Sequence, residues 1–153
     1  MLLINPGKMK KAFGTIFKQR EIVLVPFPYS DLSTTKKRPV LIISNDDYNS
    51  QFDDVLVCVI TSNQYKDDYS IGLDNDDLEI GILPELSIVK THKLFTIHKS
   101  MIIRKFSIVK PEYYTQVGQL IIKLIKSKQL LQSQDTTEIE EIIKPTEKDF
   151  IDK

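Results

Sequence analysis

Runs of apolar, mostly β-branched residues alternate with polar stretches along most of the chain. Such runs favour strands buried on at least one face. The clearest are Glu21–Phe27, Arg38–Ser44 and Val55–Thr61, and weaker patterns predict strands at Tyr69–Leu73, Leu86–Lys90, Lys93–Ile97 and Met101–Val109. Pro26 and Pro28 should end the first strand or place it at a sheet edge, because proline cannot donate to a ladder.

Polar segments rich in turn-forming residues separate these strands. Pro28–Lys37 is expected to be a solvated loop, and Asp74–Asp77 a tight turn. The loop Asn45–Asp54 is long enough for the strand after it to return antiparallel to the strand before it. This arrangement predicts that Arg38, before one strand, lies near Thr61, at the end of the next.

The pattern changes to a helical period after residue 110. Pro111 suits a first helical turn, and apolar side chains recur on one face through Leu131. A second, short helix is expected from the capping pair Asp135 and Glu138 through Ile143. Short strands followed by one long helix predict a mainly β, α+β fold: a compact, strongly curved antiparallel sheet or barrel with a long C-terminal helix.

The chain has 153 residues, which fits one domain, and a formal net charge of zero. The charges are nevertheless segregated. Residues 1–20 form a basic extension, residues 21–133 the barrel domain, and residues 134–153 an acidic tail with seven acidic side chains against three basic ones. Within the domain, residues 46–85 are acidic and residues 86–133 basic. A basic face can bind a phosphate backbone, although charge runs are also common on solvated faces.

Several function classes are excluded by what the sequence lacks. It has no apolar run long enough to span a bilayer, no signal peptide, no phosphate-binding glycine motif, no paired cysteines and no nucleophile elbow. The single cysteine, Cys58, lies in an apolar run, where a buried inert thiol is expected, and it suggests a reducing cytoplasm. The only histidines, His92 and His98, are too few for a metal site, so no metal or cofactor is predicted.

Two segments together are similar to a known family. Arg38–Asp46, followed by Val55–Ser62, resembles the signature segments of the MazF/PemK (Kid) toxins of bacterial toxin–antitoxin pairs. The likeness extends from residue 21 to about residue 131. It includes Arg20-Glu21-Ile22 where the family has Gly-Asp-Ile, the loop Pro-Phe-Pro-Tyr-Ser-Asp-Leu-Ser, and Ser87–Ile97.

The resemblance implies a metal-independent endoribonuclease toxin, an mRNA interferase that cleaves single-stranded RNA. It also implies an SH3-like barrel of the CcdB/PemK type, a homodimer and a cognate antitoxin. Arg38 and Thr61 match the family's catalytic residues. Their chemistry fits this role, because a guanidinium offers two donors to phosphate oxygens and a hydroxyl can donate to a third or relay a proton.

The general base is the weak point of this assignment. Many relatives have a glutamate five residues before the arginine, where this chain has Ser33. Arginine itself is a poor proton acceptor. Asp31, His92 or His98 could replace the glutamate, or the substrate could accept the proton itself.

Substrate binding is predicted for the first loop and the basic later segment. The candidates are Tyr29, Lys36, Lys37, Ser62, Lys90, Lys93 and Arg104. Either Tyr29 or Tyr65 could stack on an unpaired base. The alternative functions are a toxin that acts only by protein binding, like the gyrase inhibitor CcdB, and an inactive nucleic-acid-binding module. The lack of tryptophan argues against the first.

Overall fold

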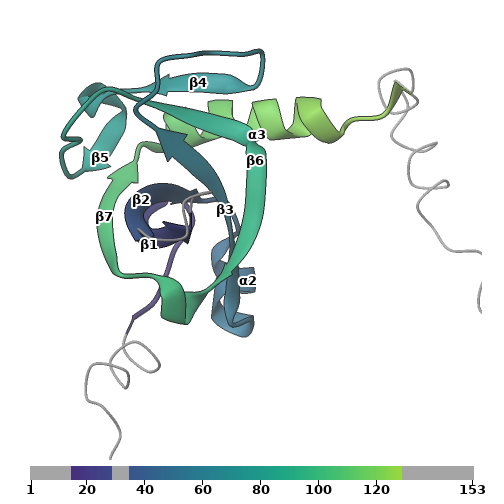
Figure 1. Cartoon of the computed structure of the whole chain (residues 1–153). Coiled ribbons are helices and arrows are strands. Elements are labelled where there is room, and N and C mark those ends of the chain that lie inside the picture. The colour runs from purple at the N-terminus through teal and green to yellow at the C-terminus, as the bar shows by residue number, and fades with distance from the viewer. Residues whose placement is uncertain (1–14, 29–34, 129–153) are drawn as a thin grey trace, which may run out of the picture. The chain divides into compact units, whose positions relative to one another are not determined.

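A single antiparallel sheet of seven strands curls into a half-barrel (Figure 1). The computed structural model describes residues 15–28 and 35–128. The strands follow the order β4-β6-β3-β2-β1-β7-β5. They are β1 Glu21–Pro28, β2 Thr35–Ile42, β3 Asp54–Thr61, β4 Ser70–Leu73, β5 Leu78–Ile80, β6 Ser87–His98 and β7 Arg104–Val109. The helices are α2 Asp46–Gln51 and α3 Pro111–Ile125, with 3-10 turns at Asn75–Asp77 and Lys99–Met101. The predicted fold class is confirmed.

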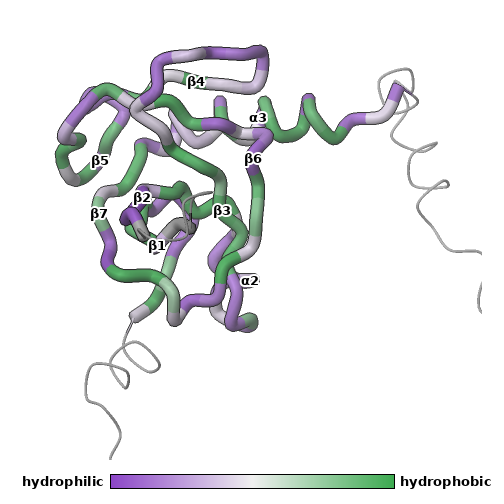
Figure 2. Tube along the Cα trace, viewed as in Figure 1, coloured by the Kyte–Doolittle hydropathy of each residue, from purple (hydrophilic) through white to green (hydrophobic). Residues whose placement is uncertain are grey.

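The sheet separates two hydrophobic clusters. Val23, Val40 and Val57 belong to the cluster on one face. The other face carries Ile22, Leu41 and Cys58, which are fully buried with Tyr113 and Val117 of α3. Figure 2 shows the hydrophobic residues running along β3, in the middle of the sheet. Alternate residues of the central strands are therefore buried on opposite faces, which explains their nearly continuous apolar sequence.

Strand β1 ends at Pro28, as predicted, but it lies inside the sheet between β2 and β7 and not at an edge. The tolerance for proline has a local cause. Strand β7 pairs with β1 only as far as Leu24, whereas β2 remains paired beyond it, with Pro26 opposite Lys37. Pro26 therefore lies where β1 has one neighbouring strand. Lys37 also belongs to β2, so the predicted loop through Lys37 ends earlier than expected.

Other sequence boundaries were wrong in informative ways. The predicted strands Leu86–Lys90 and Lys93–Ile97 form one strand, β6, with a bulge between them. The predicted loop Asn45–Asp54 contains α2, whose first turn is capped by the Asn45 side chain accepting from the Tyr48 N–H. Helix α3 ends at Ile125, before the predicted end at Leu131.

The last residues before β1 are part of the folded structure. Phe17 is buried in the cluster that contains Val23, Val40 and Val57. The Gln19 side chain donates to the Ile43 carbonyl and to the Tyr114 hydroxyl. Arg20 adopts a φ of 77°, and its guanidinium donates to Glu79 and to the carbonyl of Val109.

Gly81 follows the last residue of β5 and has a φ of 99°, in the left-handed region that favours glycine. A Cβ atom at this position would lie 2.6 Å from Cβ of Ser107. The turn into the segment before β6 therefore requires glycine. The predicted short helix that begins at Asp135 lies outside the described residues, as does the whole acidic tail. None of the described helices is long and apolar enough to cross a membrane.

Candidate functional site

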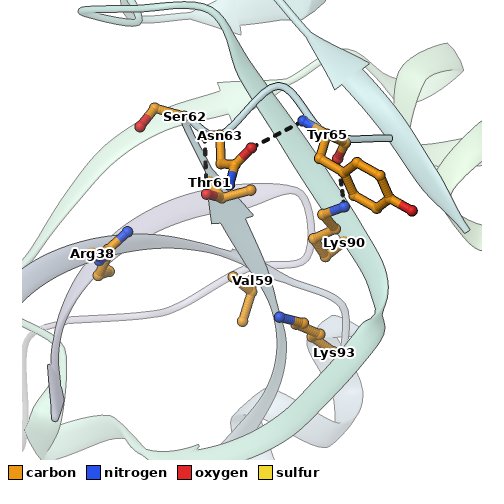
Figure 3. A pocket seen from close by; sticks show the side chains of 8 residues that line it. All are labelled: Arg38, Val59, Thr61, Ser62, Asn63, Tyr65, Lys90 and Lys93. Atoms are coloured by element: carbon orange, nitrogen blue, oxygen red, sulfur yellow. Dashed lines mark hydrogen bonds between the residues drawn. The ribbon is translucent and has the colours of Figure 1, made fainter. Parts of the chain in front are cut away.

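A polar cavity of about 540 Å³ opens where β2 begins and β3 ends, beside the middle of β6 (Figure 3). It is lined by Arg38, Val59, Thr61, Ser62, Asn63, Tyr65, Lys90 and Lys93. The cavity therefore combines cationic groups, hydroxyls, an amide and one aromatic ring, with no carboxylate among its described lining residues. Such a set of donors suits an anionic ligand.

Strand pairing explains why Arg38 and Thr61 meet. Val40 of β2 lies opposite Val59 of β3. Continuing the same antiparallel register by two residues brings Arg38 opposite Thr61, on the sheet face that also carries Val40 and Val59. Neither residue is fully buried. The predicted proximity of Arg38 and Thr61 is therefore found in the structure.

The chain leaves β3 through a turn held by side chains. The backbone N–H of Asn63 donates to Thr61 Oγ1 at 3.2 Å, and the N–H of Tyr65 donates to Asn63 Oδ1 at 3.1 Å (Figure 3). Gln64 Nε2 donates to the carbonyls of Ser62 and Leu86. Because Thr61 Oγ1 already accepts one hydrogen bond, its own hydrogen is directed away from the Asn63 N–H.

Lys90 is a buried cation in the cavity wall, with a side chain that is 9% exposed. Its Nζ donates to the Tyr65 carbonyl at 2.6 Å and to Asp67 Oδ2 at 3.3 Å. The pKa of Asp67 is lowered to about 2, first by the hydrogen bond from the Ser70 hydroxyl, then by the Tyr69 N–H and by Lys90. The ionised carboxylate therefore neutralises Lys90.

Lys93 is exposed and points into the same cavity (Figure 3). Residues three apart in a regular strand face opposite sides of a sheet. Here Cys58 pairs with Leu94 but Val59 pairs with Lys90, so β6 carries extra residues at this point. This bulge places Lys90 and Lys93 on one face.

Three other predicted binding residues, Lys36, Lys37 and Arg104, line a second cavity and not the first. This second cavity, of about 500 Å³, has Arg38 and Ser62 in common with the first. Its other lining residues include Lys36, Lys37, Glu85, Arg104 and Phe106. By strand alternation Lys37 faces away from its neighbour Arg38, whereas Arg38 and Ser62 line both cavities. Glu85 is a carboxylate at this cavity that the sequence pattern did not single out.

The predicted bases are not brought to the first cavity. His92 lies next to Asp67, with Nδ1 3.8 Å from Oδ1, and His98 lies opposite Asp54 at the far end of β6. Neither histidine is among the described residues that line the two cavities. Asp31, like Tyr29, lies outside the described residues. In the described part of the chain, no three His, Cys, Asp or Glu side chains gather in a way that could hold a metal ion.

Comparison with known proteins agrees with this geometry. The model of the family described as PemK-like, MazF-like toxins of type II toxin–antitoxin systems matches residues 18–125. The chain belongs to this family. The predicted family is thereby confirmed, and the signature segments quoted from the sequence form β2, β3 and β6 of the toxin fold.

Solved structures of low sequence identity have the same fold. They include a mycobacterial endoribonuclease in complex with its cognate antitoxin, with a TM-score of 0.58, 16% identity, and coverage of 70% of this chain and 92% of that one. A MazE–MazF complex from Deinococcus radiodurans has a TM-score of 0.59 and 14% identity, and the match covers 72% of this chain and 97% of that one. The toxin MazF-mt6 of Mycobacterium tuberculosis has a TM-score of 0.56 and 19% identity, and the match covers 68% of this chain and 94% of that one. A search of curated proteins found no significant match.

Proposed function

We propose that this PemK-like, MazF-like toxin is an endoribonuclease that cleaves single-stranded RNA at a preferred short sequence. The observation that supports this most is the position of Arg38 and Thr61 in the wall of one cavity with Lys93. Family membership agrees with it, and so does the fold likeness to two mycobacterial endoribonucleases.

The proposed reaction uses the ribose 2′-hydroxyl as an internal nucleophile. Its oxygen bonds to the adjacent phosphorus, the bond from phosphorus to the 5′ oxygen breaks, and the products are a 2′,3′-cyclic phosphate and a 5′-hydroxyl. The 2′ proton must leave and the departing 5′ oxygen must gain one. Negative charge grows on the phosphate oxygens in the transition state, so donors preorganised around them accelerate the step.

Arg38 and Thr61 would supply those donors. The guanidinium can donate to two phosphate oxygens at once, and the Thr61 hydroxyl can donate to a third. The exposed Lys93 would bind the phosphate as a point charge. For the 2′ proton we retain Asp31 or a phosphate oxygen of the substrate, because His92 and His98 lie away from the cavity.

We also propose a cognate antitoxin, a homodimeric assembly and a cytoplasmic location. Two of the structural neighbours were solved with an antitoxin, which supports the first of these. An acidic antitoxin segment would suit the cationic side chains of the two cavities. The buried thiol of Cys58 needs no oxidising compartment.

The deciding experiment is incubation of the purified full chain with a long RNA in excess chelator, followed by mapping of the new RNA ends. We expect cleavage by the wild type and a loss on the order of 100- to 1000-fold with Arg38→Ala. Lys110→Ala, which removes a cation that lines neither cavity, is the matched control. Intact RNA with the wild type, or equal cleavage by Arg38→Ala, would overturn the proposal.

A further inference from the structure

A series of hydrogen bonds joins the Thr61 hydroxyl to the ion pair of the buried Lys90 and the partly exposed Asp67. It passes from Thr61 Oγ1 to the Asn63 N–H, from Asn63 Oδ1 to the Tyr65 N–H, and from the Tyr65 carbonyl to Lys90 Nζ. Lys90 is paired in turn with Asp67. Figure 3 shows these side chains along one wall of the cavity, apart from Asp67.

The backbone of Tyr65 is held by hydrogen bonds, whereas its ring is exposed. Its N–H and its carbonyl are both hydrogen-bonded, yet the residue is 72% exposed. Lys90 Nζ lies 5.2 Å from the ring centroid. An aromatic ring with an anchored backbone and a large exposed area, at the edge of a cationic cavity, has the features of a surface on which a nucleobase stacks.

Lys90, in contrast, has little capacity left for RNA. Its Nζ donates to Tyr65 and to Asp67, and its side chain is almost fully buried. The ionised Asp67 is itself fixed by hydrogen bonds from Tyr69 and Ser70. A phosphate could reach only the one remaining N–H of Lys90, on a largely buried side chain whose charge Asp67 already neutralises.

From these contacts we infer that Tyr65 is the base-stacking residue of the cavity and that Lys90 is the positioning residue that holds it there. This inference rests on the proposed endoribonuclease function and adds to it a subsite for an unpaired base. It also replaces the phosphate contact predicted for Lys90 from sequence. Lys93, exposed and in the same cavity, keeps that predicted role.

The test measures binding of the full chain to a short fluorescent RNA of random sequence in which every 2′-hydroxyl is methylated, so that it cannot be cleaved. A second probe has the same backbone without bases. Fluorescence anisotropy gives the Kd for both probes over a range of salt concentrations. The variants are Tyr65→Ala, Tyr65→Phe, Lys90→Met and Asp67→Asn, and Lys93→Met is the matched control.

We expect Tyr65→Ala to weaken binding of the base-containing probe by about 5- to 150-fold and to leave the abasic probe unaffected. Tyr65→Phe should bind like the wild type. Lys90→Met and Asp67→Asn should show the same base-dependent loss. The slope of log Kd against log salt should stay unchanged in Lys90→Met and fall by about 0.7 in Lys93→Met, because only the latter loses a phosphate contact.

Three results would overturn the inference: equal affinity of Tyr65→Ala and wild type, an equal loss for both probes, or a reduced salt slope in Lys90→Met. Asp67→Asn retains the Lys90 side chain but removes the carboxylate charge that pairs with it, so it tests the positioning role even if Lys90→Met fails to fold. A wild type that binds neither probe would instead contradict the proposed function.

Discussion

Arg38 and Thr61 line the same cavity although half of β2, α2 and most of β3 separate them in the sequence. Two properties of the sheet cause this. β2 and β3 are antiparallel neighbours, and their register brings Val40 opposite Val59. A shift of one residue in this register would turn one of the two side chains to the opposite face.

Replacement of Thr61 by valine should separate the role of its hydroxyl from its role in packing. Valine has nearly the same shape but cannot donate, so we expect RNA cleavage to fall on the order of 100-fold. Thr61→Ser should retain most of the activity. Single-turnover cleavage rates check this, with thermal melting as a control, because the Asn63 N–H also loses its acceptor in Thr61→Val. Unchanged cleavage by the valine variant would remove Thr61 from the mechanism.

Among the three glycines of the described residues, Gly81 should be the one least able to accept a side chain. Alanine there would adopt a φ of 99° and place its Cβ 2.6 Å from Ser107 Cβ, so we expect the free energy of unfolding to fall by about 1–3 kcal/mol. Gly118→Ala is the control, because nothing lies within 4 Å of its Cβ position and it is in a helix. That variant should be more stable by about 0.5–1 kcal/mol. Urea denaturation measures both, and equal effects would contradict the role of Gly81.

The lowered pKa of Asp67 predicts a specific acid sensitivity. Its pKa falls from 3.8 to about 2 in the folded chain, so its ionised form stabilises the fold above pH 3.8. That stabilisation is lost as the pH falls towards 2, when the carboxyl group is protonated. We expect the Tm difference between wild type and Asp67→Asn to shrink over this interval. A Tm difference that does not vary with pH would show that ionisation of Asp67 does not contribute.

Cys58 should be unreactive in the native protein. Burial raises the pKa of its thiol to about 12, and the residue is fully buried. The buried thiol therefore contributes to stability only while it is protonated. Because its folded pKa lies above the unfolded value, this contribution of Cys58 is complete below pH 9.0 and is lost as the pH rises towards 12. A thiol reagent at neutral pH should label Cys58 only when urea unfolds the chain. Rapid labelling without denaturant would contradict its burial.

The strand positions could be predicted from sequence because burial on both faces leaves a clear signal. Val55–Thr61 was predicted as a strand, and β3 is Asp54–Thr61. The polar segment that contains α2 gave no apolar period. Its local features are the Asn45 side chain, which caps the first turn of the helix, and Asn49, which is buried. Neither distinguishes a short helix from a turn without the surrounding structure.

The candidate site was predictable only in part, for a related reason. Charge and residue type indicated Arg38, Lys37 and Lys90 as residues of the RNA site. They could not show that Lys37 lines only the second cavity whereas Arg38 lines both, or that Asp67 pairs with Lys90. These relationships depend on register and on contacts between distant segments. One local signal was available for Asn63, which follows a threonine by two residues and so can form a hydrogen-bonded turn with it.

Because of the bulge in β6, the orientation of the cavity lysines depends more on how many residues lie between Lys90 and Leu94 than on which residues they are. An insertion or deletion of one residue there would turn one of the two lysines out of the cavity, whereas exchange of Thr91 or His92 for another side chain would not. Evolutionary drift in this segment is therefore expected to conserve length more strictly than residue identity. Alignment gaps between Lys90 and Leu94 would then mark relatives whose cavity carries a different arrangement of cations.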